Sequence, residues 1–167
     1  MVILLASCSS DENPTPTPEP LTFDENLLLK TWTYDTILFE GTLYAYNHNP
    51  DCQKDRFVFR NNEGQVYQYD EVYFTNTYCT GNQTILTWKP VADHIDFYWD
   101  TVKIDEYKII SLTKDHFTFA IDRDMDNDGK KEHLVVTAIP DAAFNSSKIT
   151  SNKKSNLKTF AIKLPLK

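Results

Sequence analysis

Glycine is scarce in this chain: it holds only four glycines in 167 residues, whereas Phe, Tyr and Trp together make up 13%. This composition favours β-structure and excludes a wholly disordered chain. A long hydrophobic run is also missing. The apolar stretch Met1–Ala6 is far too short to span a bilayer, which takes about 20 residues. The length suits one domain with one sizeable core.

Positive charge is in short supply as well, with 17 Lys and Arg against 24 Asp and Glu and a net charge of −7. Such a balance argues against nucleic acid as the main partner. The charge is uneven, because residues 141–167 hold six lysines and one aspartate, which leaves 11 basic and 23 acidic side chains in residues 1–140. This basic tail is either a solvated terminus or a segment that meets the acidic body, anionic lipid or polysaccharide.

Motifs of the common enzyme classes are absent. The sequence has no Gly-x-Ser-x-Gly elbow and no glycine-rich phosphate loop. Four histidines are scattered along the chain without helical spacing, so a zinc hydrolase is not indicated: His48, His94, His116 and His133. Four acids on expected strands could form a glycosidase pair, but no spacing fixes their separation: Asp70, Glu71, Asp96 and Asp105. We therefore expect a protein that is not an enzyme.

The N-terminus carries the most informative local pattern, because Leu4–Cys8 is an apolar run that ends in two small residues and a cysteine. It resembles the lipobox of bacterial lipoproteins, in which the cysteine is lipidated and the residues before it are removed. The run is short for a signal sequence and lacks a basic segment before it. We interpret residues 1–7 as the end of a truncated signal peptide and Cys8 as the lipidated residue. The alternative is an ordinary buried Cys8.

A tether follows Cys8. Proline occupies every second position from Pro14 to Pro20, which favours an extended spacer without helix or ladder bonds. The acidic stretch Ser9–Glu12 also resembles the export signal of Bacteroidota-type surface lipoproteins. We therefore expect residues 8–20 to hold the protein on the outer membrane, exposed at the cell surface.

Residues 21–140 read as the folded domain. Thr22 and Glu25 indicate a short helix over 22–30, capped by Thr22. Period-two alternation then predicts eight strands, at residues 32–39, 57–59, 66–74, 84–88, 94–99, 102–112, 117–121 and 134–139. We expect an all-β antiparallel barrel, since closure removes exposed edges. In the extension 141–167, alternation over Phe160–Leu166 indicates a possible further edge strand.

Two cysteines remain once Cys8 is set aside, namely Cys52 and Cys79. An even pair in an exported chain indicates a disulfide, with a metal site as the weaker alternative. Closing this loop contributes about 3.5 kcal/mol in the chain-entropy model.

Several segments resemble the lipocalin-like domain of secreted bacterial lipoproteins, over roughly Leu27–Ile139. The family's Leu-x-Gly-x-Trp corresponds to Leu28–Trp32, with Lys30 in place of glycine, and its Tyr-x-Ile-x-x-Leu-Thr to Tyr107–Thr113. Cys52–Asp55 before a strand and Cys79 before Thr87-Trp88 also fit. The resemblance implies a lipocalin-like barrel, and eight strands leave an interior that is filled by side chains or holds one small apolar ligand.

An acidic segment lies between the last two expected strands. Its oxygen-bearing residues resemble an Asp-x-Asp-x-Asp-Gly calcium loop: Asp124, Asp126, Asp128, the Lys130 carbonyl and Glu132. Calcium takes six to eight hard oxygen ligands, and carboxylates at alternate positions can converge on one ion. We expect a structural Ca²⁺ that stiffens this hairpin, and no catalytic cofactor. The alternative is a solvated acidic turn.

Together these patterns predict a lipid-anchored, non-enzymatic surface lipoprotein whose partners are the membrane and a small apolar ligand or a protein. The alternative is a structural or interaction subunit of a cell-surface complex, with a filled barrel.

Overall fold

The computed structural model describes residues 19–62, 66–74, 79–125, 128–142 and 158–160. Within these residues the fold is nearly all β, with one 3-10 helix, η1 (Glu25–Leu27), before the strands. The strands are β1 (Thr31–Phe39), β2 (Thr42–Tyr46), β3 (Arg56–Asn62), β4 (Val66–Phe74), β5 (Gly81–Val91), β6 (His94–Trp99), β7 (Val102–Leu112), β8 (Phe117–Arg123), β9 (Glu132–Pro140) and β10 (Lys158–Phe160).

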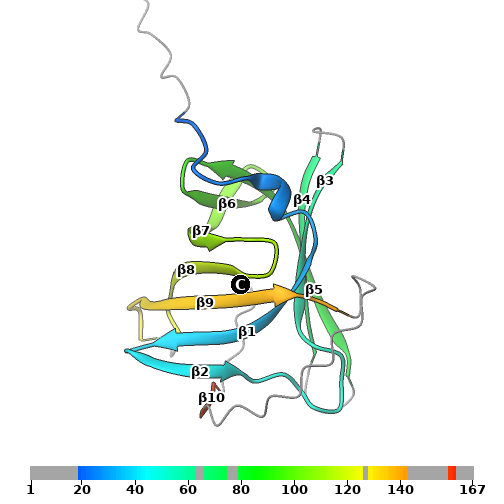
Figure 1. Ribbon diagram of the computed structural model, residues 1–167, viewed down its shortest axis with the longest axis vertical. Coiled ribbons are helices and arrows are strands. Elements are labelled where there is room, and N and C mark those ends of the chain that lie inside the picture. The colour runs from blue at the N-terminus through cyan, green and yellow to red at the C-terminus, as the bar shows by residue number, and fades with distance from the viewer. Residues whose placement is uncertain (1–18, 63–65, 75–78, 126–127, 143–157, 161–167) are drawn as a thin grey trace, which may run out of the picture.

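β1 closes the sheet into a barrel (Figure 1). Its first residues, Thr31–Thr33, pair with β3, and β9 runs antiparallel along its other edge. β1 and β3–β9 therefore form a closed eight-stranded antiparallel barrel. The second half of β1 pairs with β2, which carries the short parallel strand β10 on its other side.

The eight strands predicted from alternation are the eight strands of this barrel, so the expected fold class is confirmed. The sequence pattern misses β2, because its hairpin needs only a two-residue turn. Glu40 and Gly41 make this turn with φ values of 48° and 72°. At the C-terminus a strand does form, but β10 begins earlier than expected and ends at Phe160. Residues 161–167 lie outside the described residues.

The expected helix over 22–30 is only the three-residue η1, and its predicted cap is wrong. Asp24 is the N-cap, since its Oδ1 accepts a hydrogen bond from the Asn26 amide at 3.0 Å. The Thr22 hydroxyl instead donates to the Ala92 carbonyl, which ties the N-terminal segment to the β5–β6 turn. Leu28, directly after η1, is fully buried, and its carbonyl accepts a bond from the Trp32 indole. η1 and Leu28 thus cover one end of the barrel (Figure 1).

Aromatic side chains fill the middle of the barrel. Those with less than 2% exposure, or 2% for Tyr34, are Trp32, Tyr34, Phe57, Phe59, Tyr69, Trp88, Phe97, Tyr107, Phe117 and Phe119. Their rings touch one another. Tyr107 stacks on Phe119 with ring centroids 4.3 Å apart, and Phe97 lies 4.4 Å from Tyr107. Burying one such ring contributes about 2 to 3 kcal/mol. Of the two interiors that the resemblance left open, these contacts favour the filled one.

A disulfide and a buried carboxylate fasten the loop that leads into β3. Cys52 and Cys79 are bonded, with Cα atoms 5.2 Å apart, which confirms the predicted pair. Asp55, three residues after Cys52, is fully buried. Its Oδ1 accepts from the Phe74 amide at 2.7 Å and its Oδ2 from the Tyr46 hydroxyl at 3.0 Å. This carboxylate therefore links β2 to β4.

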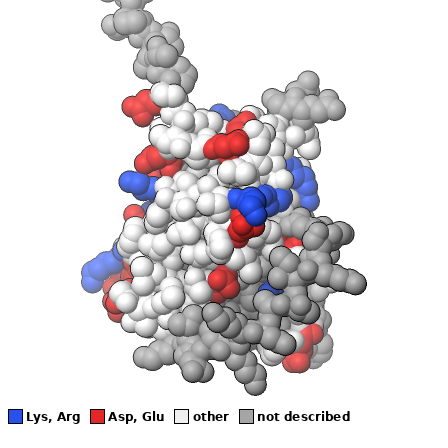
Figure 2. Space-filling view, viewed as in Figure 1, with Lys and Arg blue, Asp and Glu red and all other residues white. Residues whose placement is uncertain are grey.

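The outer surface carries charge of both signs. On the face seen in Figure 2, acidic and basic side chains lie in small groups next to each other. Among the described residues, no helix is long and apolar enough to cross a membrane.

Candidate binding site at the split between β7 and β8

Three charged side chains face the barrel interior at the end away from η1: Glu71 of β4, Asp105 of β7 and Arg123 of β8. Glu71 is only 1% exposed. The side chains of Arg123 and Asp105 are 12% and 17% exposed, and the guanidinium donates to the carboxylate in an ion pair. Taking such groups out of water is costly unless they are paired, so their contacts define this end of the barrel.

Three buried tyrosines surround these charges. The Tyr34 hydroxyl donates to Oε1 of Glu71, and the hydroxyls of Tyr69 and Tyr107 lie 3.5 Å apart. Burial, followed by the charge of Glu71, raises the pKa of all three phenols. They therefore stay neutral, and the Tyr34 hydroxyl keeps the proton that it donates to the carboxylate.

Burial and the neighbouring charges act in opposite directions on the pKa values of Arg123 and Asp105. Burial raises the pKa of Asp105, while Arg123 acts to lower it. Burial acts to lower the pKa of Arg123, but Tyr107, Asp105 and Glu71 together raise it. The guanidinium thus pairs directly with Asp105, and the charge of Glu71 further favours its charged form.

The wall of the barrel is split beside this pair. β7 pairs with β8 only from Lys108 to Leu112, with a bulge between Ile109 and Ser111. Closer to the charged end, the first part of β7 pairs with β6, and β8 pairs with β9. The facing edges of β7 and β8 therefore diverge, and backbone groups on these edges have no ladder partner across the split. The Arg123–Asp105 ion pair bridges the two strands there.

A cleft of about 490 Å³ opens on the outer wall at this split. Its lining comes from β7, β8, the start of β9 and the residue before β9: Lys103, Ile104, Asp105, Glu106, Lys108, Ala120, Ile121, Asp122, Lys131 and His133. Ala120 and Ile121 are buried and supply an apolar floor, and the bulge residue Ile104 adds an exposed apolar side chain.

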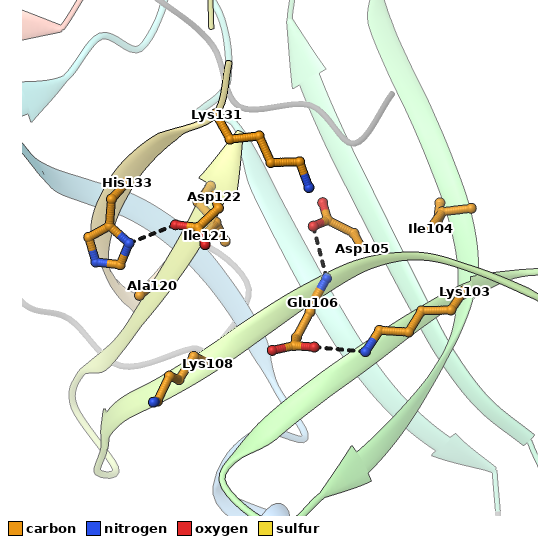
Figure 3. A pocket seen from close by; sticks show the side chains of 10 residues that line it. All are labelled: Lys103, Ile104, Asp105, Glu106, Lys108, Ala120, Ile121, Asp122, Lys131 and His133. Atoms are coloured by element: carbon orange, nitrogen blue, oxygen red, sulfur yellow. Dashed lines mark hydrogen bonds and ion pairs between the residues drawn. The ribbon is translucent and has the colours of Figure 1, made fainter. Parts of the chain in front are cut away.

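Charged side chains form the rim of this cleft (Figure 3). Lys103 bonds Glu106 at 2.7 Å, and His133 contacts Asp122 at 2.7 Å. Lys131 points its ammonium toward Asp105 across the opening. It makes no hydrogen bond or ion pair with any residue that the structure describes. An apolar floor, a charged rim and one available ammonium suit a small amphipathic ligand.

The predicted calcium ligands lie at the β8–β9 turn, next to the charged end. Asp124 accepts from the Gly129 amide at 3.1 Å, Asp128 from the Lys130 amide at 2.8 Å, and Glu132 from the Met125 amide at 2.7 Å. The other oxygen of Asp124 is buried and accepts no hydrogen bond from the residues that the structure describes. Asp126 lies outside the described residues. Asp124, Asp128 and Glu132 each hold a different backbone amide of this turn, in which Gly129 has a φ of 88°.

The remaining predicted residues divide as follows. Cys8 lies outside the described residues. The four strand acids do not form one group. Asp70 pairs with Arg60 and Asp96 with Lys103 on the outer wall, whereas Glu71 and Asp105 face inward. The latter two are tied to Tyr34 and Arg123 respectively, and both carboxyls belong to the charged interior.

Sequence reasoning missed Arg123 and Tyr34 as members of this charged interior. The signal was available for Arg123, because alternation puts it on the same face as Phe117, Phe119 and Ile121. A charged residue on the apolar face of a strand is the informative departure. The divergence of β7 from β8 has no comparable signal, since it depends on two bulges in β7.

Comparison with known proteins bears on the fold. No protein-family model matches the chain, and no curated protein sequence matches it. Among solved structures, the chain is similar to the crystal structure of the major allergen Per a 4 from cockroaches. The identity is 16%, the TM-score is 0.53, and the match covers 80% of this chain and 79% of that one. The chain has a lipocalin-like fold.

Proposed function

We propose that this protein is a lipid-anchored, non-enzymatic binding protein of the cell surface, which takes a small amphipathic ligand at the split between β7 and β8. The observation that carries the proposal is the cleft of about 490 Å³ over strands that have separated from each other. A lipocalin-like barrel is a common scaffold for binding small molecules, and the cleft gives such a ligand a place outside the filled core.

The chemistry of the cleft defines the ligand class. Ile104 and Ile121 offer apolar contact, and Lys131 offers a cation at the rim. An anionic group on the ligand would pair with Lys131, and its apolar part would lie on the two isoleucines. The aromatic interior speaks against a ligand in the middle of the barrel, because the rings of Tyr107 and Phe119 are already stacked there.

Two features support a binding role over catalysis. The buried carboxyl groups each have a fixed partner, Tyr34 for Glu71 and Arg123 for Asp105. A general acid or base must instead reach the substrate with a proton to exchange. The cleft rim is composed mainly of paired charges, which orient a ligand without offering a nucleophile.

The location belongs to the same proposal. Cys8 carries the lipid, residues 9–20 form the tether, and the barrel stands on the outer membrane at the cell surface. The Cys52–Cys79 disulfide supports a compartment outside the cytoplasm, because disulfides persist in oxidising surroundings.

Titration with the anionic dye 1-anilinonaphthalene-8-sulfonate tests the cleft, since the dye has both an apolar body and a sulfonate. We expect saturable fluorescence with one dye per chain. Lys131→Glu should weaken dye affinity about tenfold through loss of one charge pair and gain of a repulsive charge. Lys114→Glu is the matched control, because Lys114 is 81% exposed at the opposite end of β7 and β8. Equal affinity in the two variants would reject the cleft as the binding site.

Fractionation tests the anchor. Cys8→Ala should move the protein from the membrane to the soluble fraction and abolish its labelling by a fatty acid. A chain that stays on the membrane without Cys8 would refute lipid anchoring.

The filled core favours a second candidate, an interaction subunit of a surface complex. Its β6–β7 turn presents apolar side chains, with Trp99 at 62% and Val102 at 63% exposure. Solvent extraction of the purified protein followed by mass spectrometry separates the two. A co-purifying small molecule favours the binding protein, whereas an empty extract together with absent dye binding favours the subunit.

The acidic β8–β9 turn supports a further part of the proposal, a structural Ca²⁺. The buried Asp124 oxygen without a hydrogen bond is the supporting observation. Asp124, Asp128, the Lys130 carbonyl and Glu132 would hold the ion together with Asp126, and the ion would stiffen the hairpin beside the cleft.

A further inference from the structure

Three side chains with metal-ligating atoms meet on the outer wall where β6 pairs with β7. Asp96 lies directly opposite Glu106 in the ladder, and His94 stands two residues from Asp96 on the same face of β6. One ligating atom from each of the three lies within 4.8 Å of the other two. Antiparallel register therefore fixes the approach of an imidazole and two carboxylates.

Asp93 sets the orientation of the imidazole. Nδ1 of His94 lies 3.1 Å from Oδ1 of Asp93, and a carboxylate can only accept, so Nδ1 carries the proton. In the neutral ring, Nε2 then has a lone pair. It faces Oδ1 of Asp96 at 3.4 Å. A carboxylate that holds the far nitrogen is the usual support of a metal-binding histidine.

Asp96 supplies a buried oxygen that faces this lone pair. The residue is 7% exposed, and its Oδ2 accepts from the Tyr98 hydroxyl at 3.1 Å. Its Oδ1 is buried and has the Lys103 ammonium 2.5 Å away as an ion-pair partner. Nε2 and this oxygen therefore stand beside a position that a cation already occupies, the Lys103 ammonium.

We propose that His94, Asp96 and Glu106 form a binding site for a divalent transition metal, with Zn²⁺ as the best match. Zinc takes nitrogen at about 2.0–2.1 Å and carboxylate oxygen at about 2.0–2.2 Å in a tetrahedron, which puts two ligand atoms about 3.4 Å apart. The distance from His94 Nε2 to Asp96 Oδ1 has this value. Glu106 provides the third ligand, and water completes the coordination.

Lys103 occupies the place of the metal in the metal-free protein. Its ammonium bridges Asp96 at 2.5 Å and Glu106 at 2.7 Å, so it neutralises both carboxylates. The side chain is 42% exposed, and its flexible stem can move the ammonium into water when the metal enters. Lys103 is thus a built-in competitor that lowers metal affinity.

Calorimetric titration of the full, chelator-treated and dialysed chain with ZnCl₂ tests this site, with excess Ca²⁺ present to occupy the acidic turn. We expect one Zn²⁺ per chain at this site. His94→Ala should weaken binding at least tenfold, whereas the matched control His116→Ala should leave it unchanged, because His116 lies exposed in the β7–β8 turn. Lys103→Met should tighten binding several-fold by removing the competing ammonium.

Replacement of Zn²⁺ by Co²⁺ provides a second readout, since its visible absorption reports the coordination. The absorption should be lost in His94→Ala and kept in His116→Ala, and circular dichroism should show both variants to be folded. Zinc affinity that is equal in the wild type and His94→Ala would overturn the proposal. A zinc affinity that falls in Lys103→Met would overturn it as well.

Discussion

The two ends of the barrel interior are built from opposite chemistry. Beneath η1, Leu28 and Trp32 are fully buried, and the only polar atom that Trp32 brings, its indole nitrogen, bonds the Leu28 carbonyl at 3.0 Å. At the other end, Glu71 and the Arg123–Asp105 pair occupy the interior, and the wall beside them is split. One end gains stability from burial, whereas the other holds groups whose burial costs stability.

This difference fits the proposed placement of the binding site at the charged end. Lys30, which replaces the glycine of the resembled family, lies over the Trp32 ring at 5.1 Å and bonds the Lys114 carbonyl, so it adds to the closed end. At the charged end, by contrast, β7 and β8 do not pair with each other. Buried ionic groups that do not maximise stability are common at binding sites, which agrees with the proposed site.

Trp32→Ala should have the largest effect on stability. The indole is fully buried and packs against Phe117 with centroids 5.7 Å apart, so its removal leaves a cavity at the closed end. We expect a loss of about 4 kcal/mol in the free energy of unfolding, measured with urea. Leu21→Ala, at a 39% exposed position, is the control and should cost little. A loss below about 1 kcal/mol for Trp32→Ala would remove the closed end as the source of stability.

Arg123→Met should come second, with a loss of about 3 kcal/mol, because it leaves Asp105 and Glu71 without their shared cation. Arg123→Met combined with Asp105→Leu should recover most of that loss, since an apolar pair replaces a costly ionic one. The comparison between the two ends fails if the double variant is as unstable as the single one, because the ion pair would then be a net stabiliser.

Much of the fold could be predicted from the sequence. Side chains in a barrel wall point alternately inward and outward, so buried residues recur at every second position, as Trp32 and Tyr34 do. All eight barrel strands were predicted from this alternation. β2 could not, because a two-residue turn at Glu40-Gly41 and a five-residue strand leave little pattern. The predicted helix cap was also wrong. Asp24 and Thr22 both suit an N-cap, and the hydrogen bond from Thr22 to Ala92, which lies far away in the sequence, decided between them.

The loss of folding stability at alkaline pH should be the third largest effect. The pKa values of Tyr34, Tyr69 and Tyr107 are raised in the folded protein, so the stability they contribute is complete below about pH 10, the unfolded value, and declines as the pH rises toward the folded values. Three such groups predict a loss of about 2 kcal/mol between about pH 9 and 10.5.

Urea unfolding at several pH values measures this loss, and ultraviolet absorbance of tyrosinate shows which phenols ionise. Tyr107→Phe should reduce the alkaline loss by about a third, because it removes one of three linked groups. A stability profile that stays flat over this pH range would show that the charged end does not hold its phenols neutral.

Less of the candidate site was predictable. Glu71 and Asp105 were visible as strand acids, but their partners come from strands far along the chain, and only the closed barrel brings Tyr34 and Arg123 to them. The zinc ligands show the same limit. His94 and Asp96 are neighbours in sequence, whereas Glu106 reaches them only through the β6–β7 register.

Calcium removal should have the smallest effect and should act on one end only. An external calcium site with ordinary affinity contributes about 1 kcal/mol, so a chelator should lower the melting temperature by about 3 °C. Asp126→Ala should abolish this sensitivity, whereas Asp122→Asn, which alters only the pair with His133, should keep it.

Hydrogen exchange makes the test local. Calcium should slow exchange of the Met125, Gly129 and Lys130 amides, which bond the proposed ligand carboxylates, and leave the amide of Trp32 unchanged. Equal slowing at both ends would mean that the ion stabilises the whole barrel, and the two ends could then not be treated as separate units.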